Sequence, residues 1–425
     1  MRNMMSSFRY SAFRYLWLGQ VTHAAGMWID MVTIPLMVLS LYESLEQAAI
    51  NIGLVMFVRT MPHFTLGLFA GVFADNFNRK TLLVVTKIGV VFIQIIFMFV
   101  VFMDHLSMTW VYLYTFFRGA TMAFDQPARR AMIANVVPQE LYTNAMALSM
   151  GTVQATRIIA AAGAGWIIAL TSGVDRITEA DYGFQFPVTI ILILYTLAFI
   201  FTYLINYSHE VINNEGENKK TIQYVFAELI EGLRFSWSRK DIRAVVIMAA
   251  CFFLFGMVFM QVFAPLFAKI LGIGEKGLGI LLSMSGVGGA SGAVFLAAVN
   301  PNNKRGIWIL SSQIALGLSL IFFALSVAFD NMMVIYFMAI LIGLSQAIIF
   351  PLINSVLMKL TPDHLRGRAM GLLSLDRAFV SLGAAIAGPA AAYVGVTNGQ
   401  ILFGVGCVMS GIFLWIFGST LRKLD

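Results

Sequence analysis

The amino-acid sequence predicts an all-α integral membrane protein with twelve transmembrane helices in two pseudo-symmetric six-helix bundles. Of its 425 residues 59% are hydrophobic and 12% are charged, which is about half the charged share of an average soluble domain. The apolar residues gather in runs of 18 or more, the length that a helix needs to cross a bilayer. The two halves of the chain also repeat each other, as described below.

Twelve apolar runs account for most of the chain. In the first half they lie at about residues 16–41, 48–73, 81–103, 109–135, 145–171 and 186–206, and in the second half at about 244–270, 277–299, 306–329, 332–358, 369–395 and 399–421.

The charges between these runs predict the orientation. If the N-terminus lies inside, the cytoplasmic segments hold eighteen Lys and Arg, whereas the opposite side holds only Arg176, Lys269 and Lys276. Basic residues concentrate on the cytoplasmic side of membrane proteins. We therefore expect a multi-pass protein of the inner (plasma) membrane with both termini in the cytoplasm. This topology explains the net charge of +7 without a nucleic-acid partner.

One long polar stretch, residues 207–243, divides the chain. Within it, residues 221–238 have apolar side chains at near-helical spacing, which predicts an amphipathic helix on the inner membrane surface. The predicted domains are an N-terminal six-helix bundle over 1–206, this cytoplasmic linker over 207–243, and a C-terminal six-helix bundle over 244–425.

The two halves share eight residues at a constant shift of 224 positions. Parallel repeats of six spans are typical of secondary transporters. The matching residues are Gly119, Ala123, Pro127, Pro138, Leu141, Ala145, Met146 and Leu148, which recur as Gly343, Ala347, Pro351, Pro362, Leu365, Ala369, Met370 and Leu372.

A polar turn at residues 71–80 joins the second and third runs. Gly71, Asp75, Arg79 and Lys80 fit the pattern Gly-x-x-x-Asp-x-x-x-Arg-Lys, which resembles the loop between the second and third helices of major facilitator superfamily transporters. Asn78 stands where that family usually has glycine, and we expect it to adopt a left-handed backbone, which asparagine tolerates. An ordinary charged cytoplasmic turn is the alternative.

Further segments resemble the enterobactin-exporter and macrolide-efflux branch of that family. They are residues 124–128, 137–138, 144–145, 228–235 and 266–292, and the basic turn Pro362-x-x-x-Arg366-Gly367-Arg368. The resemblance implies a secondary-active transporter, a proton-coupled exporter of a small amphipathic or anionic compound such as a drug, siderophore or metabolite. It also implies a monomer that uses a small-molecule substrate, protons and the lipid bilayer, and no cofactor.

The direction of transport stays open at this stage. Exporters of the family often carry Gly-Pro in the fifth segment, whereas residues 157–165 contain no proline and Gly388-Pro389 lies in the eleventh segment instead. An importer or facilitator of an organic anion on the same fold is therefore the alternative function.

Four charged residues fall near the centres of their predicted spans, namely Asp30, Arg59, Arg118 and Arg157. A charge at that depth costs at least about 2.5–3.5 kcal/mol, so each needs a partner, water or a function. The resemblance implies that their segments surround one side of a central cavity. We expect Asp30 to respond to protons and an arginine to bind an anionic substrate group. A fixed Asp30–Arg59 ion pair, with the other arginines holding helix carbonyls, is the structural alternative.

The second half offers amides instead of charges at this depth. Gln261 and Gln346 lie among phenylalanine and methionine residues. One wall of the cavity would be charged and the other apolar, which suits an amphipathic substrate. The predicted substrate- and proton-binding residues are thus Asp30, Arg59, Arg118, Arg157, Gln261 and Gln346.

The family resemblance also implies a conformational latch on the cytoplasmic side. It would comprise Gly71, Asp75, Arg79, Lys80, Asp125, Arg366 and Arg368, with Asp125 paired to Arg79 as is common in the family. The local alternative is an i,i+4 pair between Asp125 and Arg129.

Enzymatic and metal-binding patterns are absent from the sequence. It has no His-Glu-x-x-His, no Gly-x-Ser-x-Gly and no nucleotide-binding loop, and its five histidines lack metal-ligand spacing. His23 and His63 either line the pathway or pack between helices. The sequence therefore predicts neither an enzyme nor a metalloprotein. A non-transporting receptor is disfavoured because a mere anchor has no use for mid-membrane charges.

Overall fold

The computed structural model describes residues 6–76, 78–171, 183–207, 237–299, 301, 304–329, 331–361 and 376–422. Over these ranges the chain is helical and contains no strand. The amphipathic helix predicted over 221–238 falls almost entirely outside the described residues, as do Arg366 and Arg368. Gly71 and Asp75 lie in the last turns of a helix, at positions whose side chains are likewise outside the described set.

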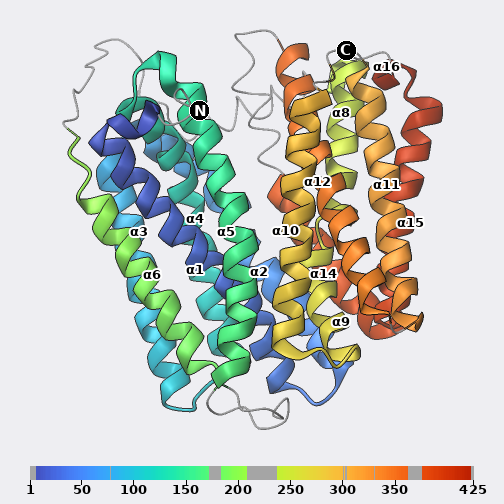
Figure 1. Ribbon diagram of the computed structural model, residues 1–425, viewed down its shortest axis with the longest axis horizontal. Helices are drawn as coiled ribbons and strands as arrows, with labels where there is room; N and C mark the ends of the chain where they lie inside the picture. Colours follow the sequence, from blue (N-terminus) through green and yellow to red (C-terminus); the bar gives the residue numbers. More distant parts are fainter. Residues whose placement is uncertain are drawn as a thin grey trace. The chain divides into compact units, whose positions relative to one another are not determined.

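Six long helices form the first half of the chain (Figure 1). A 3-10 turn, Ser6–Arg9, precedes the first of them, and another, Gln139–Leu141, precedes the fifth. The long helices are α1 (Ser11–Leu41), α2 (Leu45–Asn76), α3 (Arg79–Phe102), α4 (Met108–Val136), α5 (Tyr142–Thr171) and α6 (Gln185–Tyr203).

The second half begins with a broken helix. It consists of α8 (Lys240–Cys251), two π-helical turns η3 (Phe252–Gly256) and η4 (Phe259–Phe263), and α9 (Ala264–Ile270). Then follow α10 (Gly274–Val299), α11 (Arg305–Ser326), the turn η5 (Val327–Phe329), α12 (Met332–Leu360), α14 (Asp376–Val394), α15 (Val396–Phe417) and the short α16 (Ser419–Arg422).

Each of the twelve predicted spans falls on one of these helices, with α8 through α9 counted as the seventh. Among the described residues, nine helical segments are long and apolar enough by themselves to cross a membrane. α4 is not among the nine, and it carries Arg118, Asp125 and Arg129 within its length. The all-α membrane fold expected from the apolar runs is confirmed.

The repeat is visible in the helix boundaries. α4 begins at Met108 and ends at Val136, and α12 begins and ends 224 positions later, at Met332 and Leu360. A proline lies inside each helix at the same relative position, Pro127 and Pro351. The constant shift found in the sequence therefore corresponds to two helices of equal length.

The contacts between helices divide the chain into two compact units. One contains residues 1–33 and 61–226, and the other contains residues 34–60 and 227–425. The adjoining ends of α1 and α2 thus group with the second half. The division predicted at residues 206 and 244 did not include this grouping of the ends of α1 and α2, and it stays a prediction.

Close backbone packing explains why residues 34–60 belong to the second unit. Gly53 on α2 and Gly388 on α14 face each other, and a Cβ built on Gly53 would lie 2.6 Å from the Ala384 carbonyl oxygen and 2.9 Å from Gly388 Cα. Only small residues allow two helices to approach so closely. The hydroxyls of Thr60 and Ser381 also share a hydrogen bond. In addition, Lys269 Nζ donates to the carbonyl oxygens of residues 39 and 42, at 3.4 Å each.

The expectation of a left-handed Asn78 is wrong. Its φ is −58°, and its side chain caps α3 by accepting hydrogen bonds from the backbone N–H groups of Lys80 (2.9 Å) and Thr81 (3.2 Å). Asparagine is among the best N-cap residues because it satisfies N–H groups that have no partner within the helix. The role of Asn78 is therefore to cap the N-terminus of α3, and a left-handed chain reversal does not occur at this residue.

Candidate functional site

The first unit encloses a polar network around the hydroxyl of Tyr114, which is 3% exposed. This hydroxyl lies 2.8 Å from Asp30 Oδ1 and 2.7 Å from Gln94 Oε1. The Gln94 amide in turn donates to the Val188 carbonyl oxygen at 3.0 Å, so that its orientation is fixed. The four residues come from α1, α3, α4 and α6, which meet at this point.

Hydrogen-bond counting shows what this network can do. A tyrosine hydroxyl has one proton to donate, yet two acceptor oxygens face Tyr114. With Asp30 ionised, the hydroxyl can donate its proton to only one of these two oxygens at a time. With Asp30 protonated, the carboxyl can donate to the hydroxyl, which then donates to Gln94, and both contacts are satisfied. The arrangement therefore accommodates both protonation states of Asp30.

Arg118 lies in the same buried region. Its Nη2 donates to the Tyr195 hydroxyl at 2.5 Å, and its guanidinium carbon lies 4.5 Å from the centre of the Tyr195 ring. Arg118 is also within electrostatic range of Asp30 and Tyr114. The structure thus brings together two of the four charged residues that the sequence singled out, Asp30 and Arg118.

His23 and Gly26 on α1 complete the surroundings of Tyr195. The His23 and Tyr195 rings are 5.2 Å apart between their centres. A Cβ on Gly26 would lie 2.7 Å from the Tyr195 ring, so glycine is required for the ring to pack there. Both ring nitrogens of His23 are buried without a hydrogen-bond partner among the described residues.

The other two predicted arginines are placed differently. Arg157 on α5 is 8% exposed, and its guanidinium carbon lies 5.8 Å from the centre of the Trp28 ring, a cation–π distance. Arg59 is 7% exposed and belongs to the residues of α2 that pack with the second unit. Arg59 thus belongs to the second unit and Asp30 to the first, and the expected Asp30–Arg59 pair stays a prediction.

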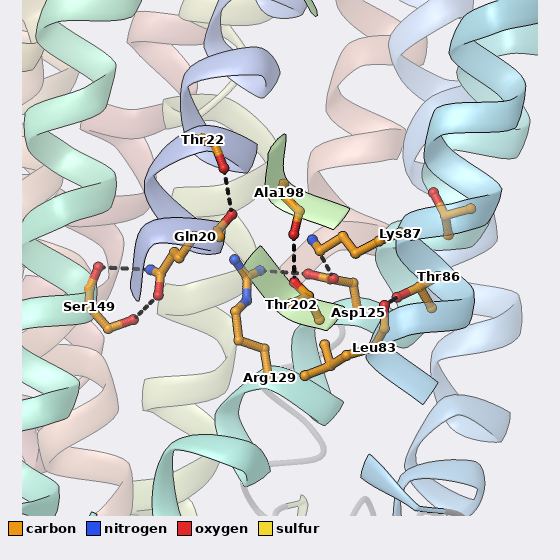
Figure 2. Close-up of polar contacts among 12 residues, drawn as sticks. Gln20, Thr22, Leu83, Thr86, Lys87, Asp125, Arg129, Ser149, Ala198 and Thr202 are labelled. Carbon is orange, nitrogen blue, oxygen red and sulfur yellow. Dashed lines mark hydrogen bonds and ion pairs between the residues drawn. The ribbon is translucent and has the colours of Figure 1, made fainter. Parts of the chain in front are cut away.

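A second cluster of charges joins α3 and α4 (Figure 2). Lys87 Nζ lies 2.6 Å from Asp125 Oδ1, and Arg129 Nη2 lies 2.9 Å from Asp125 Oδ2. The i,i+4 pair with Arg129, which was the local alternative, is present. Arg79 instead donates to Asn135 Oδ1 at 2.5 Å, so the Asp125–Arg79 pair implied by the family resemblance is absent from the contacts of the described residues.

Lys87 was missed as a partner of Asp125. The sequence signal was a lysine inside an apolar run, with an acid in the next run near the same end of the helices. The second half has a similar contact: Arg305 at the start of α11 donates to Ser355 Oγ on α12 at 2.8 Å. In each half an arginine at the start of one helix thus binds a side chain within the last two turns of the next helix.

Figure 2 also shows a reciprocal amide–hydroxyl pair between α1 and α5. Gln20 Nε2 donates to the Ser149 carbonyl oxygen at 2.9 Å, and Ser149 Oγ donates to Gln20 Oε1 at 2.6 Å. Both residues are buried. The pair holds α5 against α1 and was not foreseen from the sequence.

The two predicted glutamines of the second unit lie at the broken helix or bind to it. Gln261 belongs to the π-turn η4, and Gln346 on α12 donates from Nε2 to the Gly256 carbonyl oxygen of η3 at 2.9 Å. The side-chain carbonyl oxygens of both glutamines are buried without a hydrogen-bond partner among the described residues. Single π-turns within α-helices are frequent at functional sites. These two oxygens are therefore acceptors that a substrate could use.

The described residues contain no group of three or more His, Cys, Asp or Glu side chains that could hold a metal ion. Cys251 and Cys407 are free thiols.

Comparison with known families decides the identity of this fold. The family model of the Major Facilitator Superfamily matches residues 16–375. The chain belongs to the Major Facilitator Superfamily. It is thus a multi-pass membrane transporter rather than an enzyme.

Its curated relatives are transporters of bacteria. The chain is 21% identical to the staphyloferrin A transporter of Staphylococcus aureus (strain NCTC 8325 / PS 47), over 94% of this chain and 95% of the relative. It is 29% identical to the multidrug efflux pump Tap of Mycolicibacterium fortuitum, over 47% of this chain and 48% of Tap. It is 26% identical to the staphylopine export protein of S. aureus (strain Mu50 / ATCC 700699), over 49% and 51%. The last two matches thus span about half the length of those relatives.

Solved structures agree on the fold. A D-xylose–proton symporter matches with a TM-score of 0.74 at 12% identity, over 97% of this chain and 98% of the symporter. A bacterial homologue of the human lysosomal transporter Spinster, in an inward-facing and occupied conformation, matches with a TM-score of 0.72 at 13% identity, over 97% of each chain. At such identities the similarity concerns the fold alone.

Proposed function

We propose that this transporter is a proton-coupled exporter of a small amphipathic or anionic compound, such as a drug, siderophore or metabolite, working by alternating access. It acts as a monomer in the plasma membrane with both termini in the cytoplasm. The efflux and export functions named for Tap and the staphylopine export protein support this direction. An importer or facilitator of an organic anion is the second candidate, because the fifth segment lacks the proline of many exporters.

The observation that carries proton coupling is the network of Asp30, Tyr114 and Gln94. One hydroxyl proton faces two buried oxygens, so a proton on Asp30 lets the hydroxyl accept from the carboxyl while it donates to Gln94, whereas without that proton the hydroxyl donates to only one of the two. Arg118 lies within electrostatic range of the same carboxyl. Binding of an anionic substrate group near Arg118 therefore changes the electrostatic potential at Asp30 and with it the free energy of proton binding there. An antiporter requires this linkage between substrate and proton.

The substrate contacts follow from the same residues. Arg118 and Arg157 are buried cations that can bind an anionic group, and Arg59 is a third candidate. The carbonyl oxygens of Gln261 and Gln346 can accept hydrogen bonds from the polar part of an amphipathic compound. If Gln replacements of all three arginines bind and transport as the parent does, these arginines are only structural.

The test uses purified protein in liposomes with an imposed pH gradient and a panel of anionic siderophores, macrolides and amphipathic dyes. Transport against the substrate gradient, in the direction opposite to proton flow, is expected. Asp30→Asn should still bind substrate but lose its response to the pH gradient. Asp104→Asn, at an exposed position, is the control. An Asp30→Asn variant that drives uphill transport with unchanged pH dependence would exclude the role of Asp30, and substrate uptake with the protons would favour the importer.

The latch is a separate proposal. Asp75 at the end of α2 would meet the start of the eleventh segment, where the helix dipole favours a carboxylate by about 0.3–1 kcal/mol. Asp75→Asn should slow transport with little change in substrate affinity. Cross-linking between cysteines at position 75 and at 368–371 checks the contact, and absence of a cross-link in every condition tested would remove it.

A further inference from the structure

The cluster of Lys87, Asp125 and Arg129 has an unbalanced charge. Two cations share one carboxylate, at 2.6 and 2.9 Å. Lys87 is 3% exposed and Asp125 1% exposed, so one of the positive charges has no counter-ion among the described residues in a buried position. A buried charge without compensation is costly, and an ionisable group in that situation tends to become neutral.

Only one member of the cluster can lose its charge. An arginine keeps its proton in proteins, and Asp125 has a cation against each of its oxygens, which favours the ionised carboxylate. Lys87 has three N–H donors, yet its Nζ has no hydrogen-bond partner among the described residues beyond the ion pair. Release of one proton from Lys87 therefore leaves a neutral cluster in which the Asp125–Arg129 pair persists.

The groups that face Lys87 from neighbouring helices favour this release. Arg118 and Arg129 on α4 and His23 on α1 are within electrostatic range of Lys87 or of its carboxylate partner. None of these groups adds a negative charge, and Asp125 is the one anion of the set. The hydroxyls of Thr86 and Thr202, which Figure 2 draws beside the cluster, donate to carbonyl oxygens of their own helices.

We propose that Lys87 is a proton-binding site of this transporter, separate from Asp30. The ammonium transfers a proton to water, which gives hydronium and a neutral amine beside the Asp125–Arg129 ion pair, and in the return step the amine takes a proton from hydronium. No other bond changes. This inference rests on the proposed proton coupling for its physiological meaning, but the proton binding itself can be measured without a substrate.

The decisive variant is Lys87→Arg. Arginine keeps the positive charge and can keep the ion pair with Asp125, but it cannot release the proton. Purified parent and variant would be titrated in detergent with a pH-indicator dye between about pH 6 and pH 9, a range below that in which ordinary lysines titrate. The parent should release about one proton per molecule more than Lys87→Arg. Lys240→Arg, at an exposed position, should release as many as the parent.

Equal proton release by the parent and Lys87→Arg would overturn the proposal. If Lys87→Arg does not fold, as judged by gel filtration and thermal unfolding, Lys87→Gln serves in the same titration with the same expected difference of about one proton. In liposomes, Lys87→Arg should retain exchange of substrate across the membrane but lose accumulation driven by a pH gradient. A parent that shows no gradient-driven transport refutes the proposed function, whereas the titration still decides the role of Lys87.

Discussion

Replacement of Gly53 by alanine tests the close approach of α2 and α14. The new Cβ would lie 2.6 Å from the Ala384 carbonyl oxygen, whereas ordinary contacts begin at 3.4 Å. The two helices must therefore separate by about 0.8 Å at this point. Backbone atoms form the obstacle, so a side-chain rotation cannot relieve it. Overpacking of this kind costs about 1–3 kcal/mol.

A matched control separates packing from helix propensity. Alanine is favoured over glycine inside a helix by about 0.8–1 kcal/mol, and this gain applies to every glycine within a helix. A Cβ added to Gly163 on α5 would meet no atom of another helix within 4 Å, so Gly163→Ala should stabilise the protein by up to about 1 kcal/mol. The difference between the two variants isolates the overpacking cost of about 1–3 kcal/mol.

The assay measures both stability and the contact itself. Thermal unfolding in detergent reports the free-energy difference. Cysteines at Thr60 and Ser381, whose hydroxyls share a hydrogen bond, report by disulfide formation how often α2 and α14 touch. A cost of about 1–3 kcal/mol lowers the ratio of molecules with α2 and α14 in contact to molecules with the two helices apart by about 5- to 150-fold. Equal stability and equal cross-linking in Gly53→Ala and Gly163→Ala would refute the packing argument.

Three further substitutions test the polar contacts of the first unit. Asp125→Asn should destabilise the protein by about 3–5 kcal/mol, because it takes the carboxylate away from Arg129, which keeps its charge, and from Lys87; thermal unfolding checks this, and a loss no larger than that of an exposed Asp104→Asn variant would contradict it. Tyr114→Phe removes the hydroxyl between Asp30 and Gln94 and should cost about 1–3 kcal/mol, while shifting the pH dependence of transport; an unchanged pH profile would separate Tyr114 from coupling. Ser149→Ala should lose about 1 kcal/mol through its bond to Gln20, and no loss in urea unfolding would show that the amide finds another partner.

The helices and the repeat could be predicted from the sequence because both depend on local pattern. Apolar runs of membrane length specify helices, and the constant shift of 224 specifies matching ones. Asn78 shows the limit of local reasoning. Asparagine favours both a left-handed turn and an N-cap, and the start of α3 at residue 79 decides for the cap.

The candidate site was only partly predictable, because its contacts depend on which helix faces meet. Asp30 and Arg118 were noticed as isolated mid-membrane charges, but Tyr114 and Gln94, which connect α1 with α3 and α4, are indistinguishable in sequence from packing residues. Lys87 was visible as a charge in a span, yet its pairing with Asp125 requires the register of α3 against α4. The π-turns at Phe252–Gly256 and Phe259–Phe263 contain no proline or charge that would signal a break.

Because α4 and α12 have equal length, the side chains at their matching positions can be compared directly. The positions of α12 that lie 224 residues after Asp125 and Arg129 are occupied by Ile349 and Ile353, both fully buried. Hydrocarbon packing does not depend on acidity, and α12 has no ionisable group at these two positions, whereas α4 supplies the carboxylate that lies beside Lys87, the proposed proton-binding site. The two halves share one helical plan, and the proton binding proposed for Lys87 would change the free energy of the first half at a level where the matching positions of α12 hold only hydrocarbon.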